Sequence, residues 1–263
     1  MLERCTCDLL NGTESSESRS LPARLLLAGD RALVVAFSES EQPAVPPGRA
    51  LELVIALDRA LASAPPRGFV EAIPAYDSLL VAYDPAVADV EAIARAIERA
   101  LATLTDAARA PVKRWRIPVV YGGAFGPDLP AVAGHLGLDE SEVVCRHAGA
   151  AYTVAMMGFL PGFTYLAGLP ASLAVPRLAT PRPRVPGGGI GIGGAQTAIG
   201  SIPGPSGWHQ IGRTPVLTFD RNRQPVTFLE QGDEVELVAI GAELFADIAR
   251  AAAAGEIVAE RAR

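Results

Sequence analysis

Apolar positions in the first part of the chain form two kinds of pattern. Four short runs, separated by Gly, Pro, Asp or Ser, are typical of β-strands; they lie at 25–27, 32–37, 69–73 and 79–83. Two longer segments, 51–61 and 87–104, place apolar residues at helical spacing. The order β-β-α-β-β-α predicts a small α/β sandwich over residues 21–105, with both helices on one face of an antiparallel sheet.

The ends of these segments carry further signals. Gly29-Asp30 between the first two runs predicts a hairpin. Asp84 followed by Pro85 predicts the N-cap and the first position of the second helix. The prolines of 38–48 predict a loop, and the polar, Ala-rich residues 105–110 predict the domain boundary.

A second domain is expected over residues 111–241. Its opening run, 115–121, reads as a strand, and Pro118 within it predicts an edge strand or a bulge. Asp139, with Glu142 three residues later, predicts a capping box at the start of a helix. The other expected elements are helices at 128–136 and 140–148, strands at 216–219, 226–229 and 234–240, and a C-terminal helix, with its pattern over 242–254, in the final segment 242–263.

Residues 152–214 are the densest part of the chain in Gly, Pro and aromatic residues. Disordered segments avoid aromatic residues, so this stretch is not a linker. Gly and Pro at this density predict short strands joined by tight turns, whose loops build a pocket. Many short strands of this kind suggest a barrel, and the fold class expected for the whole chain is α+β.

Composition excludes several classes of function. The chain has 263 residues, 49% hydrophobic and 20% charged, as in a soluble globular protein with a real core. A net charge of −6 does not suggest a nucleic-acid surface. No apolar run is long enough to cross a membrane, and the Ser/Glu-rich residues 1–20 read as a disordered tail without a secretory signal, so a cytoplasmic location is expected. Three cysteines predict no disulfide framework, and no motif predicts a metal site.

The sequence comes close to three known binding or catalytic motifs but does not satisfy any of them. Gly189, Gly191 and Gly194 match G-x-G-x-x-G, but the Gly- and Pro-containing residues that follow cannot open a long helix, so a dinucleotide site is rejected. The only lysine, Lys113, does not lie in a phosphate loop. The Ser206 segment is one residue short of a nucleophile elbow.

Polar side chains within the Gly/Pro-rich stretch are the candidates for binding a ligand. Guanidinium groups bind carboxylates and phosphates through two parallel hydrogen bonds, so Arg177, Arg182 and Arg213 suit an anionic substrate, whereas bracing between loops is the alternative for each. Gln196 and Thr197, after a Gly-Gly turn, can read an amide or a carboxylate. The remaining candidates are aromatic or loop residues that form either a core or a partner surface: Phe159, Pro161, Gly162, Phe163, Tyr165 and Trp208.

A series of short motifs resembles the family of 5-oxoprolinase B subunits, also called the KipI or allophanate hydrolase subunit 1 type. The motifs are Gly158-Phe-Leu-Pro-Gly-Phe-x-Tyr-Leu166, Pro176-Arg177, Pro181-Arg182, Val185-Pro186, Gly193-Gly-x-Gln-Thr197 and Gly207-Trp-x-x-Ile-Gly-Arg-Thr214. Weaker matches reach upstream to Gly29-Asp30, so the resemblance covers roughly residues 24–240. The family shares its core with the carboxyltransferase domain of urea carboxylase, and the resemblance implies a cyclophilin-like barrel.

The resemblance also implies a function. It makes this chain one component of an ATP-dependent 5-oxoprolinase, working with a C-type subunit, related to allophanate hydrolase subunit 2, and with an A-type subunit. ATP and Mg would be bound by the assembled complex. His147 matches a family histidine and joins the candidate site residues, although a buried histidine bonded to a backbone carbonyl is equally compatible. The alternatives are a non-catalytic inhibitor of a sensor histidine kinase, of the KipI type, and a carboxyltransferase-type subunit in urea or allophanate metabolism.

Four positions depart from the family pattern within the expected pocket. Leu178 stands where a second arginine is usual, and Gly200-Ser201 stand where relatives carry Tyr-Pro. Ser206 replaces a glycine before Gly207-Trp208. These changes bear on the substrate, which the sequence leaves open among 5-oxoproline, urea and allophanate, more than on the fold.

Overall fold

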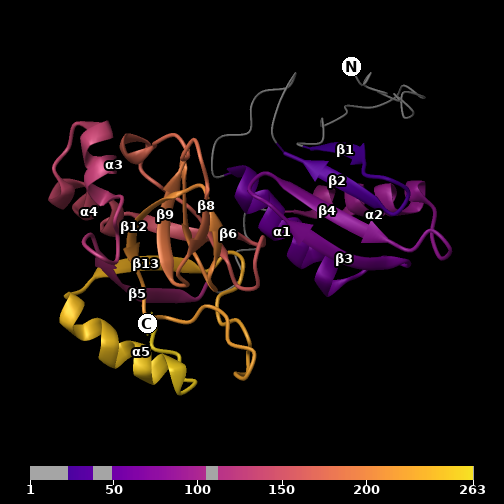
Figure 1. Ribbon diagram of the computed structural model, residues 1–263. Helices are drawn as coiled ribbons and strands as arrows, with labels where there is room; N and C mark the ends of the chain where they lie inside the picture. The colour runs from indigo at the N-terminus through magenta and orange to yellow at the C-terminus, as the bar shows by residue number, and fades with distance from the viewer. Residues whose placement is uncertain (1–22, 38–48, 105–111, 263) are drawn as a thin grey trace.

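The computed structural model describes residues 23–37, 49–104 and 112–262 (Figure 1). The expected tail at 1–20, the loop at 38–48 and the boundary at 105–110 lie outside the described residues. Two bodies follow one another along the chain, an N-terminal sandwich and a barrel, as Figure 1 shows. No helix within the described residues is long and apolar enough to cross a membrane.

The N-terminal sandwich is a four-stranded antiparallel sheet with strand order β1-β2-β4-β3. Its elements are β1 (Arg24–Leu27), β2 (Ala32–Ala36), α1 (Arg49–Ser63), β3 (Phe69–Pro74), β4 (Ser78–Tyr83) and α2 (Val90–Thr103). Leu33, Val35, Leu79 and Val81 alternate with outward residues and pack in one core with both helices. The expected sandwich is therefore confirmed.

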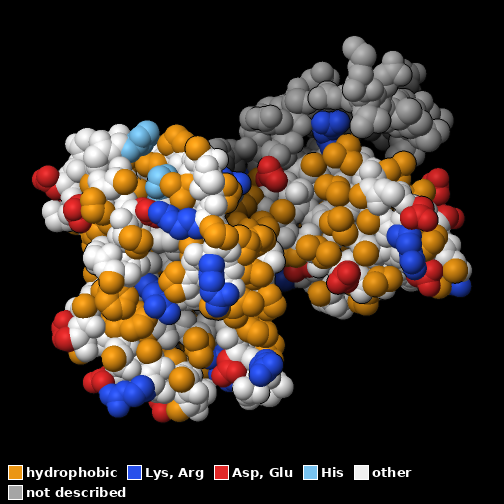
Figure 2. Space-filling view, in the orientation of Figure 1, with side chains coloured by type: hydrophobic (Ala, Val, Ile, Leu, Met, Phe, Trp, Pro, Cys, Tyr) orange, Lys and Arg blue, Asp and Glu red, His pale blue; other side chains and the backbone are white. Residues whose placement is uncertain are grey.

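The other face of this sheet stays apolar. Leu26, Val34, Leu80 and Ile73 are aligned across the four strands by the strand register. Leu26 and Ile73 are exposed, and Figure 2 shows hydrophobic side chains gathered on this domain.

The second helix begins later than the sequence suggested. Asp89 is its N-cap, and its Oδ1 accepts a hydrogen bond of 2.7 Å from the backbone N–H of Ala92. Asp84, the predicted cap, instead closes a turn: its side chain accepts from Ala86 N, and its carbonyl accepts from Val87 N. The prediction at Asp84 was wrong because two candidate caps stand five positions apart, and the turn uses the first.

The second body is a closed barrel. Its strand order is β12-β9-β10-β7-β6-β13-β5, and pairing of β12 with β5 closes the circle. The strands are β5 (Arg114–Tyr121), β6 (Ala151–Met157), β7 (Thr164–Ala167), β9 (Gly189–Gly193), β10 (Gln196–Ile199), β12 (His209–Arg213) and β13 (Glu234–Ala239). A short pair, β8 (Arg182–Val185) with β11 (Gly204–Ser206), lies beside it. The α+β class with a barrel is thus confirmed.

Pro118 lies inside the barrel wall, not at an edge. On one side β5 pairs in parallel with β13. On the other side its first residues pair with β14 (Glu260–Ala262) and its last with β12, so Pro118 falls in the gap between the two. A missing N–H is tolerated there because no strand faces it. The prediction of an edge strand was wrong, but its reason holds, because proline still occupies a position where no backbone N–H is needed for pairing.

Several smaller expectations changed. Helices α3 (Leu129–Leu136) and α4 (Glu140–Ala148) are present, but the capping box is not: Asp139 makes no side-chain cap, and the Glu142 carboxylate accepts from Arg146. Residues 216–219 and 226–229 form only an isolated bridge between Phe219 and Thr227. The final segment holds a 3₁₀ turn (Ala242–Leu244), helix α5 (Phe245–Ala253) and strand β14, so its end is not helical. A second 3₁₀ turn spans Ala171–Leu173.

The two bodies touch through named contacts. The Tyr76 hydroxyl, in the turn between β3 and β4, donates to the carbonyl of Leu166 in β7 at 3.0 Å. Gly232 of the barrel approaches α1 so closely that an added Cβ would lie 3.2 Å from Arg59 and 3.4 Å from Ile55. Its φ of +86° also lies in the region that favours glycine, so this position suits glycine on both counts.

Candidate functional site

A glycine face on β9 organises the candidate site. Gly and Ile alternate along this strand, so Ile190 and Ile192 enter the barrel core and the glycines face outward. A methyl group at Gly193 would lie 2.7 Å from the Trp208 ring, and one at Gly189 would lie 2.2 Å from Gln210 Oε1. Only glycine lets these two side chains lie against the strand. The segment read as G-x-G-x-x-G is thus a strand, which agrees with the rejection of a dinucleotide loop.

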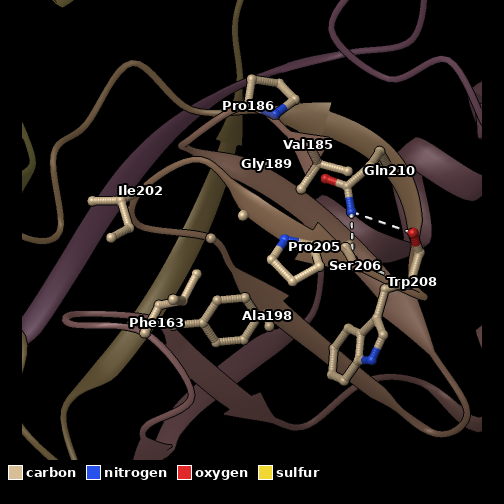
Figure 3. Close-up of a pocket in the computed structure, with 14 residues that line it drawn as sticks. Phe163, Val185, Pro186, Gly189, Ala198, Ile202, Pro205, Ser206, Trp208 and Gln210 are labelled. Carbon is tan, nitrogen blue, oxygen red and sulfur yellow. Dashed lines mark hydrogen bonds between the residues drawn. The ribbon is translucent and has the colours of Figure 1, made fainter. Parts of the chain in front are cut away.

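A narrow cleft lies over this glycine face (Figure 3). Its walls are largely apolar and include the backbone of several glycines. Gln210 is its main polar side chain, and the Gln210 amide nitrogen lies 3.3 Å from the Trp208 carbonyl and 3.5 Å from Ser206 Oγ. The lining residues are Leu160, Phe163, Val185, Pro186, Gly189, Gly191, Ala198, Gly200, Ile202, Gly204, Pro205, Ser206, Trp208 and Gln210.

Aromatic side chains form one rim of the cleft. Phe163 and Tyr165 have ring centroids 4.9 Å apart, and Tyr165 and Trp208 lie 5.8 Å apart. The Arg177 guanidinium stacks 5.5 Å from the centroid of Trp208. Arg177 is exposed and has no carboxylate at ion-pair distance among the described residues. Arg177 is not part of the cleft wall: it lines a separate hollow with Pro176 and His209, and its positive charge adjoins the cleft only through the stacking on Trp208.

The loop between β6 and β7 supplies the rest of this rim. Phe159 and Pro161 are exposed, whereas Gly162 is buried with φ +71°. A Cβ at Gly162 would lie 2.5 Å from Phe219 Cβ, so this position needs glycine for both its backbone conformation and its packing. Of the aromatic and loop candidates, Phe163 and Trp208 line the cleft, while the others are not part of its wall.

His147 lies elsewhere, in the barrel core. Its ring is fully buried, with Nε2 2.9 Å from Thr197 Oγ1 and Nδ1 2.9 Å from the Tyr121 hydroxyl. Thr197 gives its single hydroxyl proton to the carbonyl of Gly191. Thr197 must therefore accept from His147 Nε2–H, which leaves Nδ1 to accept from Tyr121.

The burial of His147 also fixes its charge. Desolvation disfavours the imidazolium and lowers the pKa of His147 to about 3. The neutral ring ties α4 to strands β5, β9 and β10 through hydrogen bonds. His147 and Thr197 therefore serve the barrel core, and the structure does not place them against the cleft.

Arg182 is committed to an ion pair. Its two terminal nitrogens donate to the two oxygens of Asp128, at 2.8 and 2.6 Å. Asp128, a buried carboxylate before α3, also accepts from the backbone N–H of Gln210 at 2.7 Å. The alternative of a bracing arginine therefore describes Arg182 better than a ligand contact.

The remaining two candidates also lie outside the cleft. Arg213 donates through Nε to the carbonyl of Gly187 at 2.8 Å, and its guanidinium stacks on Phe245 of α5. Gln196 is half-buried at the start of β10 and is not part of the cleft wall. Neither Arg213 nor Gln196 therefore lies in the one pocket that the sequence predicted the candidates to share.

Sequence reasoning missed Gln210 and Asp128. The alternation of Gly and Ile in β9 was the available signal for Gln210, since a glycine face needs a large side chain from a neighbouring strand to cover it. Two of the departures from the family pattern, Gly200 and Ser206, line the cleft. Ser201 is buried and is not part of the cleft wall.

Comparison with known proteins identifies the family. Residues 23–229 match the family described as carboxyltransferase domain, subdomain C and D. The chain is 37% identical over 222 residues to the 5-oxoprolinase B subunit of Bacillus subtilis, covering 81% of this chain and 90% of that protein. It is 50% identical over 122 residues to the 5-oxoprolinase B subunit of Escherichia coli O157:H7, covering 46% of this chain and 56% of that one.

Solved structures show the same architecture. The crystal structure of TTHA0988 is similar with a TM-score of 0.68 and 33% identity, and the match covers 81% of this chain but only 40% of the longer one. The urea amidolyase of Kluyveromyces lactis matches with a TM-score of 0.72 over 93% of this chain and 17% of its own, at 17% identity, which supports the fold alone. The chain belongs to the carboxyltransferase subdomain C and D family, together with proteins named as the B subunit of 5-oxoprolinase.

Proposed function

We propose that this chain is the B subunit of an ATP-dependent 5-oxoprolinase, which opens the lactam of 5-oxo-L-proline to L-glutamate. The observation that carries the proposal is the cleft over the glycine face of β9, with Arg177 unneutralised beside it. It occurs in a chain that is 37% identical to a protein of that name over most of both lengths.

The residue types along the cleft suit this substrate, but the cleft has a volume of only about 20 Å³, little more than a water molecule needs, and must widen to admit it. 5-Oxoproline has a compact apolar ring, a lactam and a carboxylate. The aromatic walls from Phe163 and Trp208 suit the ring. The Oε1 of Gln210 can accept a hydrogen bond from the lactam N–H, whereas its Nε2 already donates within the protein. Arg177 can bind the carboxylate through its planar guanidinium.

The activation step belongs to the assembled complex. A lactam carbonyl is a poor electrophile, and phosphorylation of its oxygen by ATP would make it open to attack. The described residues contain no cluster of three His, Cys, Asp or Glu side chains that could hold a metal ion by themselves. We assign nucleotide binding to the assembled complex, and to this chain the binding and orientation of substrate.

The isolated chain is expected to be inactive. Purified alone, it should form no glutamate from 5-oxoproline and ATP, because the cleft supplies binding groups, whereas activation of the lactam is assigned to the assembled complex. Co-expressed with a homologue of the C-type subunit, it should co-purify, and the mixture should form glutamate once the A-type subunit is added. Glutamate from the partner-free chain, or failure to co-purify with the C-type subunit, would contradict the proposed role.

Replacing Arg177 by lysine is expected to lower kcat/KM of the assembled enzyme about ten- to a hundredfold, the cost of one charge-assisted contact. The ammonium keeps the charge but lacks the planar fork. The melting temperature should not change, since Arg177 is exposed and makes no ion pair among the described residues.

Arg184 provides the matched control. It is an exposed arginine in the neighbouring strand β8 that is not part of the cleft wall. Arg184→Lys should leave both kinetics and melting unchanged. Equal kinetics for Arg177→Lys and wild type would remove Arg177 from the substrate site.

A further inference from the structure

Phe159 combines two unfavourable features. Its side chain is 63% exposed, and it is the only aromatic residue among the large hydrophobic residues that are exposed in the described part of the chain. Its φ of +69° makes it the only non-glycine residue with a positive φ in the described part of the chain. The N–H of Leu160 donates to the carbonyl of Gly158 at 2.8 Å, which closes a three-residue γ-turn centred on Phe159, a rare and strained conformation.

The surrounding loop holds this conformation in place. Gly158 N donates to the carbonyl of Phe163 at 3.1 Å, and Phe163 N donates to the carbonyl of Leu160 at 3.0 Å. Gly162 packs against Phe219 and anchors the loop to the barrel. The ring of Phe159 makes an edge contact with Phe163, at 5.7 Å between centroids. A rigid turn therefore presents an aromatic side chain to solvent.

The position of this side chain is informative. Leu160 and Phe163, which both follow Phe159 in the same loop, line the cleft, so the exposed ring stands at the rim of the proposed substrate site. Rigid, exposed aromatic residues are typical anchors of protein–protein interfaces, because little conformational entropy is lost when they are buried. A partner seated on Phe159 would lie next to the cleft.

We propose that Phe159 is an anchor that inserts into an apolar pocket of the C-type partner and brings that protein against the cleft. This inference rests on the proposed function. In the similar chain of TTHA0988, 60% of the polypeptide lies outside the match, so further protein is joined to this module there. Continuity of the exposed ring with the cleft wall selects this face of the barrel for the contact.

The test is the affinity of purified full-length variants for the purified homologue of the C-type subunit, measured by titration calorimetry. Phe159→Ala should weaken binding at least tenfold, as loss of an interface anchor does. Phe159→Gly should weaken it as much while leaving the melting temperature equal to or above that of wild type, because glycine accepts a positive φ without strain. A simple folding defect cannot produce that pair of results.

Val70→Ala is the control, since Val70 is 59% exposed on the N-terminal sheet. It should bind the C-type partner as wild type does. If wild type binds and Phe159→Ala binds equally well, the anchor is wrong and the proposed function stands. Weakening by Val70→Ala alone would overturn the anchor and move the interface to the N-terminal domain. If wild type does not bind the C-type partner at all, the proposed function fails together with the anchor.

Discussion

Replacing His147 by alanine is expected to lower the free energy of unfolding by about 4 kcal/mol, from the cavity left in the core and the lost hydrogen bonds. The buried Tyr121 hydroxyl would lose its acceptor, and helix α4 would lose its polar link to β10. Urea denaturation measures the change. His135→Ala, at an exposed histidine of α3, is the control and should alter stability by less than about 0.5 kcal/mol.

The buried His147 also predicts that the protein loses stability in acid. The folded-state pKa of His147, about 3, lies below its unfolded value of 6.5. The contribution of the neutral ring is therefore complete above pH 6.5 and is lost as the pH falls toward 3. The slope approaches about 1.4 kcal/mol per pH unit, so at pH 5 wild type should be about 2 kcal/mol less stable from this group. His147→Gln should lack this component, and an unchanged pH slope would contradict the neutral buried histidine.

Replacing Asp128 by alanine is expected to destabilise the protein by about 3 kcal/mol, because it removes a buried carboxylate that accepts three hydrogen bonds. Two come from Arg182 and one from the backbone of Gln210. Since Gln210 lines the cleft, the change should also disturb the site. Thermal melting and urea denaturation measure the effect.

Asp139→Ala separates this effect from a general loss of negative charge. Asp139 also precedes a helix, but it is exposed and its side chain makes no cap hydrogen bond. The control should cost well under about 1 kcal/mol. A similar small cost at Asp128 would mean that the ion pair with Arg182 is not a brace, and would return Arg182 to the ligand candidates.

Much of the fold followed from local patterns in the sequence. The hairpin at Gly29-Asp30 and the apolar stripes of α1 and α2 are local signals, and the structure confirms them. Barrel closure is not local, since β12 meets β5 from far along the chain, and β14 joins β5 from beyond α5. The spacing of apolar residues cannot reveal which distant strands pair, and this explains why strand β14 was not predicted.

The site was less predictable for the same reason. Residue type indicated that arginines could bind an anion, but it did not distinguish Arg177, stacked beside the cleft, from Arg182, paired with Asp128. The carboxylate that decides the matter lies 54 positions away in the sequence. His147 matched a family motif, yet its burial gives it a structural role. The expected pocket was predicted more successfully: a high density of Gly and Pro indicates loops that come together, and Phe163 and Trp208 of these loops do line a cleft.

The most direct test of the proposed function is the substrate choice of the reconstituted complex. The chain is mixed with its A-type and C-type partners, ATP and magnesium, and glutamate, ammonia and phosphate are measured with 5-oxoproline, urea or allophanate as the substrate. We expect glutamate and phosphate in equal amounts from 5-oxoproline, and no turnover of urea or allophanate. Turnover of urea or allophanate with no glutamate from 5-oxoproline would contradict the proposal in favour of the carboxyltransferase-type role, and inactivity on all three by a stable complex would favour a regulatory role.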